Sequence, residues 1–127
     1  MGEPPRVLVV DDDAGIRDLL DLALTDAGYA VALAEDGAAA LAMVEAVAPD
    51  VILLDMRMPV LDGWAFAEAY RQRPGRRAPI VVMTAARDAP GSAAQIAAMG
   101  YVAKPFDLAD LLACVARYRP SHDARCA

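Results

Sequence analysis

The chain has 127 residues, of which 57% are hydrophobic and 24% charged, and a formal net charge of −6. These values predict one globular domain and argue against a disordered chain, a membrane span or nucleic acid as the main partner. The N-terminus lacks the pattern of a signal peptide, and the two cysteines, Cys114 and Cys126, form no metal-ligand pattern, so we expect free thiols in a cytoplasmic protein.

Five short apolar segments are predicted to be β-strands, because each is rich in aliphatic residues and ends at polar or turn residues. The third segment, Val51-Ile52-Leu53-Leu54, shows no alternation, which is typical of a parallel strand buried on both faces. The five predicted strands cover residues 6–10, 29–34, 51–54, 79–83 and 100–103.

A helix is predicted after each strand, because apolar residues recur there at helical spacing. Asp12 or Asp13 can cap the first helix, which stops at Gly28, and Asp36 can cap the second. The fourth helix is expected to be short and to cover residues 93–99, because proline and glycine precede it.

Strands that alternate with helices predict parallel strands joined by right-handed crossovers. The fold class is therefore α/β, a three-layer sandwich with a five-stranded parallel sheet. We expect one domain over residues 1–119, followed by a polar tail or the start of a linker over residues 120–127.

Polar side chains follow directly on four of the predicted strands. Asp11 and Asp12 follow the first, Asp55 the third, Thr84 the fourth and Lys104 the fifth. The carboxyl ends of parallel strands share one edge of the sheet, where open α/β sheets bind ligands. These side chains are therefore expected to converge if their strands are neighbours, whereas Asp55 alone could equally cap a loop.

Three carboxylates at one edge would repel one another, since two unit charges ~4 Å apart cost about 4 kcal/mol at an effective dielectric constant of ~20. Such a cluster needs a cation, and carboxylates without His or Cys favour Mg²⁺. Lys104 is the only lysine and offers a compact positive charge to a phosphate, to which the Thr84 hydroxyl can also donate. These are the parts of phosphoryl transfer, with Asp55 as the nucleophile that forms an aspartyl phosphate.

Four motifs, in this order, resemble the receiver domain of bacterial two-component response regulators, the chemotaxis regulators included. The resemblance covers residues 6 to about 119 and implies a flavodoxin-like sheet order, 2-1-3-4-5. The motifs are Val9-Val10-Asp11-Asp12, Leu54-Asp55-Met56-Arg57-Met58-Pro59 with Asp62-Gly63, Met83-Thr84-Ala85, and Tyr101-Val102-Ala103-Lys104-Pro105-Phe106.

The resemblance implies that Asp55 receives a phosphoryl group from a sensor histidine kinase or a histidine phosphotransfer protein. Mg²⁺ would be held by Asp11, Asp12, Asp55 and the backbone carbonyl of Arg57. The protein would then not be an enzyme with a separate substrate, because it only catalyses its own phosphorylation and dephosphorylation.

The resemblance also implies how phosphorylation is read. Lys104 and Thr84 would take phosphoryl oxygens, and Lys104-Pro105 resembles a cis peptide of the family. Tyr101 resembles the aromatic residue that turns inward when Thr84 moves toward the phosphate. Asp13 does not match the metal-binding pair of the family, so we expect it to face solvent or to cap a helix.

The resemblance further implies an output surface made of the fourth helix, the fifth strand and the fifth helix. Its partner is not identified by the sequence, and the resemblance allows a homodimer through this surface. A pseudo-receiver, which binds partners without being phosphorylated, is the alternative. The sequence leaves open whether the domain stands alone or belongs to a longer regulator.

Overall fold

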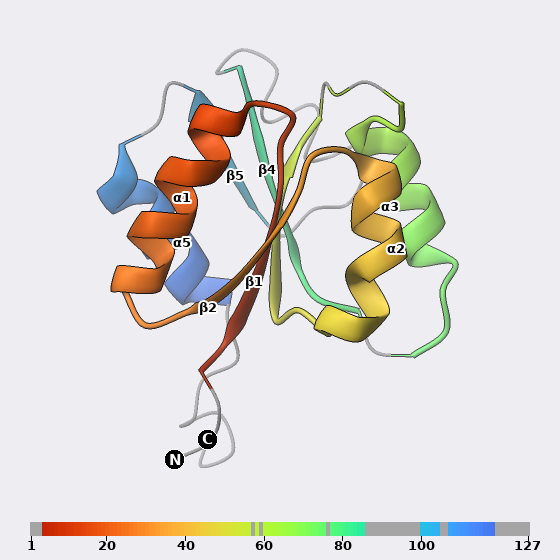
Figure 1. Ribbon diagram of the computed structural model, residues 1–127, viewed down its shortest axis with the longest axis horizontal. Helices are drawn as coiled ribbons and strands as arrows, with labels where there is room; N and C mark the ends of the chain where they lie inside the picture. The colour runs from red at the N-terminus through yellow and green to blue at the C-terminus, as the bar shows by residue number, and fades with distance from the viewer. Residues whose placement is uncertain are drawn as a thin grey trace.

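The sheet of the computed structural model has five strands, all parallel, in the order β2-β1-β3-β4-β5, which confirms the predicted fold class and order (Figure 1). The structure describes residues 4–56, 58, 60–75, 77–85, 100–104 and 107–118, with the side chains of residues 85, 103 and 104 excepted. The strands are β1 (Arg6–Val10), β2 (Ala30–Ala34), β3 (Val51–Asp55), β4 (Ile80–Ala85) and β5 (Gly100–Lys104).

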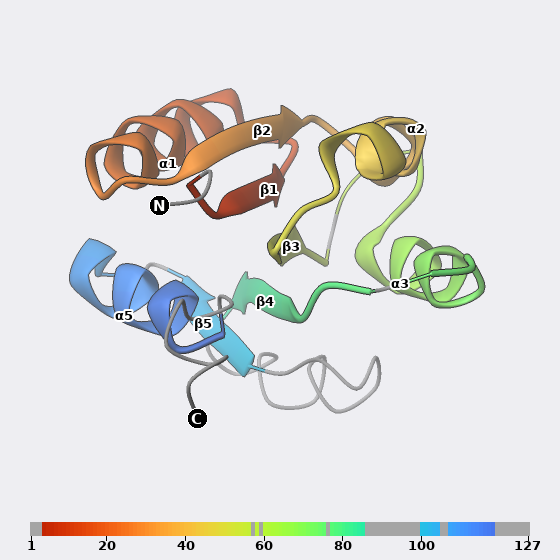
Figure 2. The ribbon, with the colours of Figure 1, turned by 90° about the horizontal axis from the view of Figure 1, so that it is seen from below.

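Helices cover both faces of the sheet, which gives the predicted three layers. Helices α1 and α5 lie on one face and α2 and α3 on the other (Figure 2). Their bounds are α1 (Ala14–Asp26), α2 (Gly37–Val47), α3 (Gly63–Arg71) and α5 (Leu108–Tyr118). The predicted fourth helix, residues 93–99, lies outside the described residues. Within the described part of the chain, no helix has both the length and the apolar character needed to cross a membrane.

The central strand β3 is buried along its whole length. Its side chains alternate between two apolar clusters: Ile52 and Leu54 pack on the side of α2 and α3, and Val51 and Leu53 on the side of α1 and α5. The same alternation holds in β1. Packing on both faces fixes the direction of β3, so the residue at its carboxyl end, Asp55, is held in place by the core.

Aspartates begin three of the helices at the carboxyl edge of the sheet, the upper edge in Figure 1. Asp13 caps α1, Asp36 caps α2 and Asp62 caps α3, each by accepting backbone N–H groups of the first turn. A cap of this kind contributes about 1 kcal/mol to stability. Asp13 is exposed and caps α1, as expected, and Asp12 is therefore not used as a cap.

Four of the five strands have boundaries that differ from the prediction by one or two residues. Tyr29 lies outside β2, because its N–H donates to Leu24 O and so closes the end of α1. Asp55, Thr84 and Lys104 are inside their strands rather than after them, because the ladder continues to the end: Asp55 pairs with Met83, and Lys104 with Ala85.

Candidate functional site

Three carboxylates meet at the carboxyl edge of the sheet. Strands β1 and β3 are neighbours, and Val10 pairs with Leu54, so the residues that follow, Asp11 and Asp55, emerge side by side. One oxygen from each of Asp11, Asp12 and Asp55 lies within 4.8 Å of the other two. The structure thus brings together the three acidic residues that the sequence analysis singled out.

These carboxylates differ in exposure. Asp11 is fully buried and Asp55 is 6% exposed, whereas Asp12 is exposed to solvent. Oδ1 of Asp11 accepts the N–H of Asp13 at 2.9 Å. Buried carboxylates are costly unless they are paired, and several in one place repel one another. A cation bound among these three carboxylates would offset their mutual repulsion.

The donor atoms of this cluster fit Mg²⁺. All three side chains offer carboxylate oxygens, which suit a hard cation, and none offers the nitrogen or sulfur that zinc sites use. A few carboxylates leave room for water and phosphate oxygens in an octahedral shell. The fourth predicted ligand, the carbonyl of Arg57, lies outside the described residues.

The two predicted phosphate-binding residues belong to the neighbouring strands. Thr84 is 4% exposed and follows Met83, the ladder partner of Asp55. The backbone of Lys104 lies in β5 and pairs with Ala85, which places it at the same edge of the sheet as Asp55. The side chain of Lys104 and the Lys104-Pro105 peptide lie outside the described set.

Two further polar residues lie outside the acidic cluster. Tyr101, the predicted switch residue, is 50% exposed on β5. Glu35 is exposed and follows β2, a strand at the edge of the sheet.

Two backbone hydrogen bonds hold the loop that follows Asp55, and neither was predicted from the sequence. The N–H of Gly37, at the start of α2, donates to Leu61 O at 3.0 Å, and the N–H of Gly63 donates to Met56 O at 3.0 Å. A Cβ atom on Gly63 would lie 2.7 Å from Met56 Cα. Both glycines therefore permit close backbone contacts that set the path of the chain beyond Asp55.

Arg17 is a second neighbour of the site that the sequence analysis missed. Its Nη1 donates to the backbone carbonyl of Asp11 at 2.7 Å. The sequence offered one indication of this contact: Arg17 lies in the first turn of the helix that follows the acidic motif.

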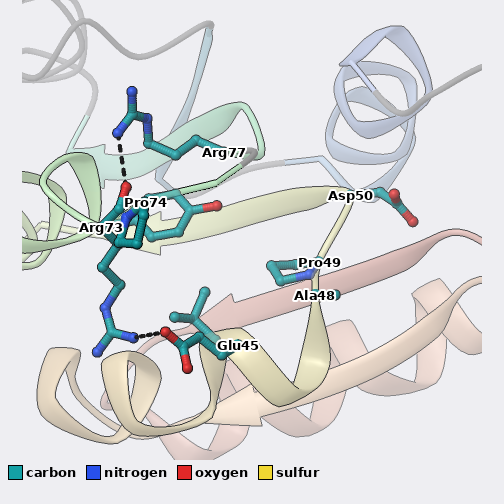
Figure 3. Close-up of a pocket in the computed structure, with 9 residues that line it drawn as sticks. Glu45, Ala48, Pro49, Asp50, Arg73, Pro74 and Arg77 are labelled. Atoms are coloured by element: carbon teal, nitrogen blue, oxygen red, sulfur yellow. Dashed lines mark hydrogen bonds and ion pairs between the residues drawn. The ribbon is translucent and has the colours of Figure 1, made fainter.

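A cavity of about 270 Å³ lies at the other end of the sheet, between the C-terminal ends of α2 and α3 (Figure 3). Apolar groups of Ala48, Pro49 and Pro74 line it, and an ion pair between Arg73 and Glu45, 3.1 Å long, borders it. It contains none of the predicted site residues.

The one described cysteine also lies outside the acidic site. Cys114 is a half-buried residue of α5 that packs beside the apolar cluster under α1 and α5. Burial raises the pKa of its thiol, and the nearby Arg117 acts in the opposite direction. A raised pKa favours the neutral thiol, which suits its contact with the apolar cluster.

The domain is a doubly wound α/β fold with three carboxylates that could bind a cation at the carboxyl ends of its strands. A family model described as the response regulator receiver domain matches residues 7–116. The chain therefore belongs to the response regulator receiver domain family.

Two relatives show how much of a longer regulator such a domain can form. The chain is 42% identical over 113 residues to the DNA-binding transcriptional regulator NtrC of Escherichia coli strain K12, covering 87% of this chain and 24% of NtrC. It is 40% identical over 125 residues to the response regulator MprA of Mycobacterium avium strain 104, covering 94% of this chain and 54% of MprA. The chain thus spans about a quarter of one relative and about half of the other.

Among solved structures, the chemotaxis response regulator CheY4 of Vibrio cholerae matches with a TM-score of 0.82 and 35% sequence identity. The match covers 91% of this chain and 98% of CheY4, so both consist of the same domain over nearly their whole length.

Proposed function

We propose that this domain accepts a phosphoryl group on Asp55 from the phosphohistidine of a sensor histidine kinase or a histidine phosphotransfer protein. The observation that carries the proposal is the meeting of Asp11, Asp12 and Asp55 within 4.8 Å at the end of the central strand. Membership of the receiver family supports the same role.

In the proposed step, a carboxylate oxygen of Asp55 attacks the phosphorus atom of the phosphohistidine. The new P–O bond forms as the P–N bond breaks, and the electron pair of the P–N bond stays on the imidazole nitrogen of the donor. The Thr84 hydroxyl and the Lys104 ammonium would contact the phosphoryl oxygens and stabilise their charge. The protein is then a phosphoacceptor that catalyses its own modification, not an enzyme acting on a separate substrate.

Mg²⁺ is the proposed cofactor. Asp11, Asp12, Asp55 and the carbonyl of Arg57 would hold the ion, which when bound would neutralise negative charge on the transferring group. The carboxylates of Asp11 and Asp12 would hold the positive charge of the ion beside the nucleophile, Asp55. Asp11 is buried and held by the surrounding structure, whereas Asp12 is exposed to solvent.

The proposed output is a change in the surface that includes β5 and α5, together with the predicted fourth helix. Tyr101 is half exposed, which is compatible with an outward position before phosphorylation. Movement of Thr84 toward the phosphate would leave room for Tyr101 to turn inward. A further partner or a second copy would then bind the altered surface. A cytoplasmic location remains part of the proposal and rests on the composition and cysteine content.

Acetyl phosphate with Mg²⁺ tests the proposal directly. Intact-mass spectrometry is expected to show one added phosphoryl group on the wild-type protein and none on Asp55→Asn. Asp110→Asn, which changes an exposed aspartate of α5, is the matched control and should react like the wild type. Chelation of Mg²⁺ should abolish the reaction. An unmodified wild-type protein that still binds a histidine kinase would instead support the pseudo-receiver alternative.

A further inference from the structure

The acidic motif after β1 is held by an arginine from the following helix. Arg17 lies in the first turns of α1 and is half-buried. Its Nη1 donates to the backbone carbonyl oxygen of Asp11 at 2.7 Å, a short, charge-assisted hydrogen bond. The Arg17 N–H also donates to Asp13 O at 3.0 Å, so both the side chain and the backbone of Arg17 tie α1 to this motif.

Asp11 is thereby fixed at three different atoms. Its N–H donates to Ala34 O at 3.1 Å, which continues the ladder with β2. Its side-chain Oδ1 accepts the Asp13 N–H at 2.9 Å, and its carbonyl accepts from Arg17. These bonds come from a neighbouring strand, the following loop and a helix, so rotation of the Asp11 backbone would break at least one of them.

The carbonyl that Arg17 contacts belongs to the peptide group between Asp11 and Asp12. The orientation of this peptide group determines ψ of Asp11 and φ of Asp12, and therefore how the two carboxylates face each other. Asp11 is also held by burial, but Asp12 is exposed, so no surrounding core fixes its side chain. The bond from Arg17 thus acts on the less constrained of the two carboxylates.

Arg17 has a second, opposing effect on a cation. Its guanidinium is bonded to the backbone of the acidic motif, and a positive charge there offsets repulsion among the carboxylates but also disfavours a divalent ion. Because Arg17 is partly exposed, solvent and salt screen this long-range effect. The direct hydrogen bond to the peptide group is short and acts at contact distance, so it depends less on screening. We therefore expect the positioning effect to be the larger one, and the two effects predict opposite changes in Mg²⁺ affinity.

We propose that Arg17 is a positioning residue of the magnesium site, which holds the Asp11–Asp12 peptide group in the orientation that lets both carboxylates bind one ion. This inference rests on the proposed function, since it takes the acidic cluster to be a Mg²⁺ site. In this proposal Arg17 acts through the peptide group and is not itself a ligand of the ion or of the phosphoryl group.

The test compares Arg17→Met with Arg6→Met. Arg6 is also partly buried, and its Nη1 also donates to a backbone carbonyl, Val47 O at 2.9 Å, but at the other end of β1. Both substitutions remove one positive charge and a side-chain bond to a backbone carbonyl. Mg²⁺ affinity is measured by isothermal titration calorimetry, and thermal stability without Mg²⁺ is measured alongside.

Arg17→Met is expected to weaken Mg²⁺ binding by about tenfold, the size typical of residues that orient metal ligands. Arg6→Met is expected to leave the affinity within about twofold of wild type while lowering thermal stability. The milder Arg17→Lys is expected to weaken binding by a smaller factor in the same direction.

Unchanged or tighter Mg²⁺ binding in both Arg17 variants, with normal binding by the wild type, would overturn the inference and leave the proposed function intact. Equal weakening by Arg6→Met and Arg17→Met would also overturn it, because the effect would then be one of general stability. A wild-type protein that binds no Mg²⁺ would overturn both proposals.

Discussion

An aspartate lies at each end of β3, and the two aspartates have different electrostatic surroundings. At the amino end, Asp50 accepts the Arg6 N–H at 2.8 Å, and its own N–H donates to Arg6 O at 2.8 Å. At the carboxyl end, Asp55 lies beside two further carboxylates. The amino end uses its acid to join two strands, whereas the carboxyl end gathers like charges.

The charges at the two ends of the sheet are arranged differently in the cation-free protein. Residues at the amino end form pairs, such as Arg73 with Glu45 beside the cavity in Figure 3. Crowded carboxylates at the carboxyl end raise the energy of the cation-free fold, and a bound cation would recover that energy. Substitutions at the two ends should therefore change the free energy of unfolding by different amounts or in opposite directions.

The largest expected effect is steric and concerns the loop after Asp55. Gly63→Ala should lower the free energy of unfolding by about 2–3 kcal/mol, because the new Cβ would meet Met56 and Asp55 backbone atoms. Gly75→Ala, near the amino end, has open space around it but a φ of 94°, so a smaller loss of about 1 kcal/mol is expected. Urea denaturation measures both, and equal losses would show that the loop after Asp55 tolerates displacement.

The next effect is a contrast of sign between aspartates. Without Mg²⁺ and at low salt, Asp12→Asn should raise the free energy of unfolding by about 1 kcal/mol, because it removes repulsion within the cluster. Asp50→Asn should lower it by about 0.5–1 kcal/mol, since it weakens the bond with Arg6. Thermal melts in low and high salt measure the contrast.

Mg²⁺ should further separate these two variants. The ion should raise the melting temperature of the wild type and of Asp50→Asn, but that of Asp12→Asn much less. A melting temperature of the wild type that does not respond to Mg²⁺ would contradict the view of the carboxyl end as a cation site.

Two residues other than glycine have a positive φ in the described part of the chain, and they lie at opposite ends of the sheet. Val60, in the loop after Asp55, has a φ of 68°, and Ala48, after α2, has a φ of 48°. Val60→Gly and Ala48→Gly should each stabilise the fold, by about 1 and 0.5 kcal/mol, because a β-branched residue is more strained there than alanine. Chemical denaturation can rank them, and a loss of stability in Val60→Gly would show that its exposed side chain makes contacts that offset the strain.

The smallest effect is expected at the ion pair beside the cavity. Arg73→Ala should cost at most about 0.5 kcal/mol, because its partner Glu45 is largely exposed and the pair is screened. Glu45→Ala and the double variant complete a double-mutant cycle that isolates the pair. A coupling energy several times larger would mean that the amino end is held by charge rather than by apolar packing.

Much of the fold was predictable from local patterns. The unbroken apolar run of β3 and the turn residues after it indicated a buried parallel strand, and the structure confirms one over Val51–Asp55. Asp36 was predicted as a helix cap from its position before an apolar repeat, and it caps α2. The rule that parallel strands end at one edge, combined with the strand order that the family resemblance implies, predicted that Asp11, Asp12 and Asp55 would meet.

Features that depend on close approach between distant segments were not predictable. Nothing in the local sequence says that Gly37 N–H will meet Leu61 O, or that Arg17 will reach back to the Asp11 carbonyl. The positive φ of Val60 also has no local signal, because a valine is a poor choice for that conformation. These contacts arise when helices dock on the sheet and loops must close over short distances.

Local sequence is enough to identify the apolar segments, the helix caps and the charged side chains, because hydrophobic periodicity and capping involve neighbouring residues. The tertiary structure decided which of those charges meet. Pairing of β1 with β3 placed Asp11 next to Asp55, and packing of α1 on the sheet brought Arg17 to the backbone of Asp11. Charge interactions depend on distance in space, which only the folded chain defines.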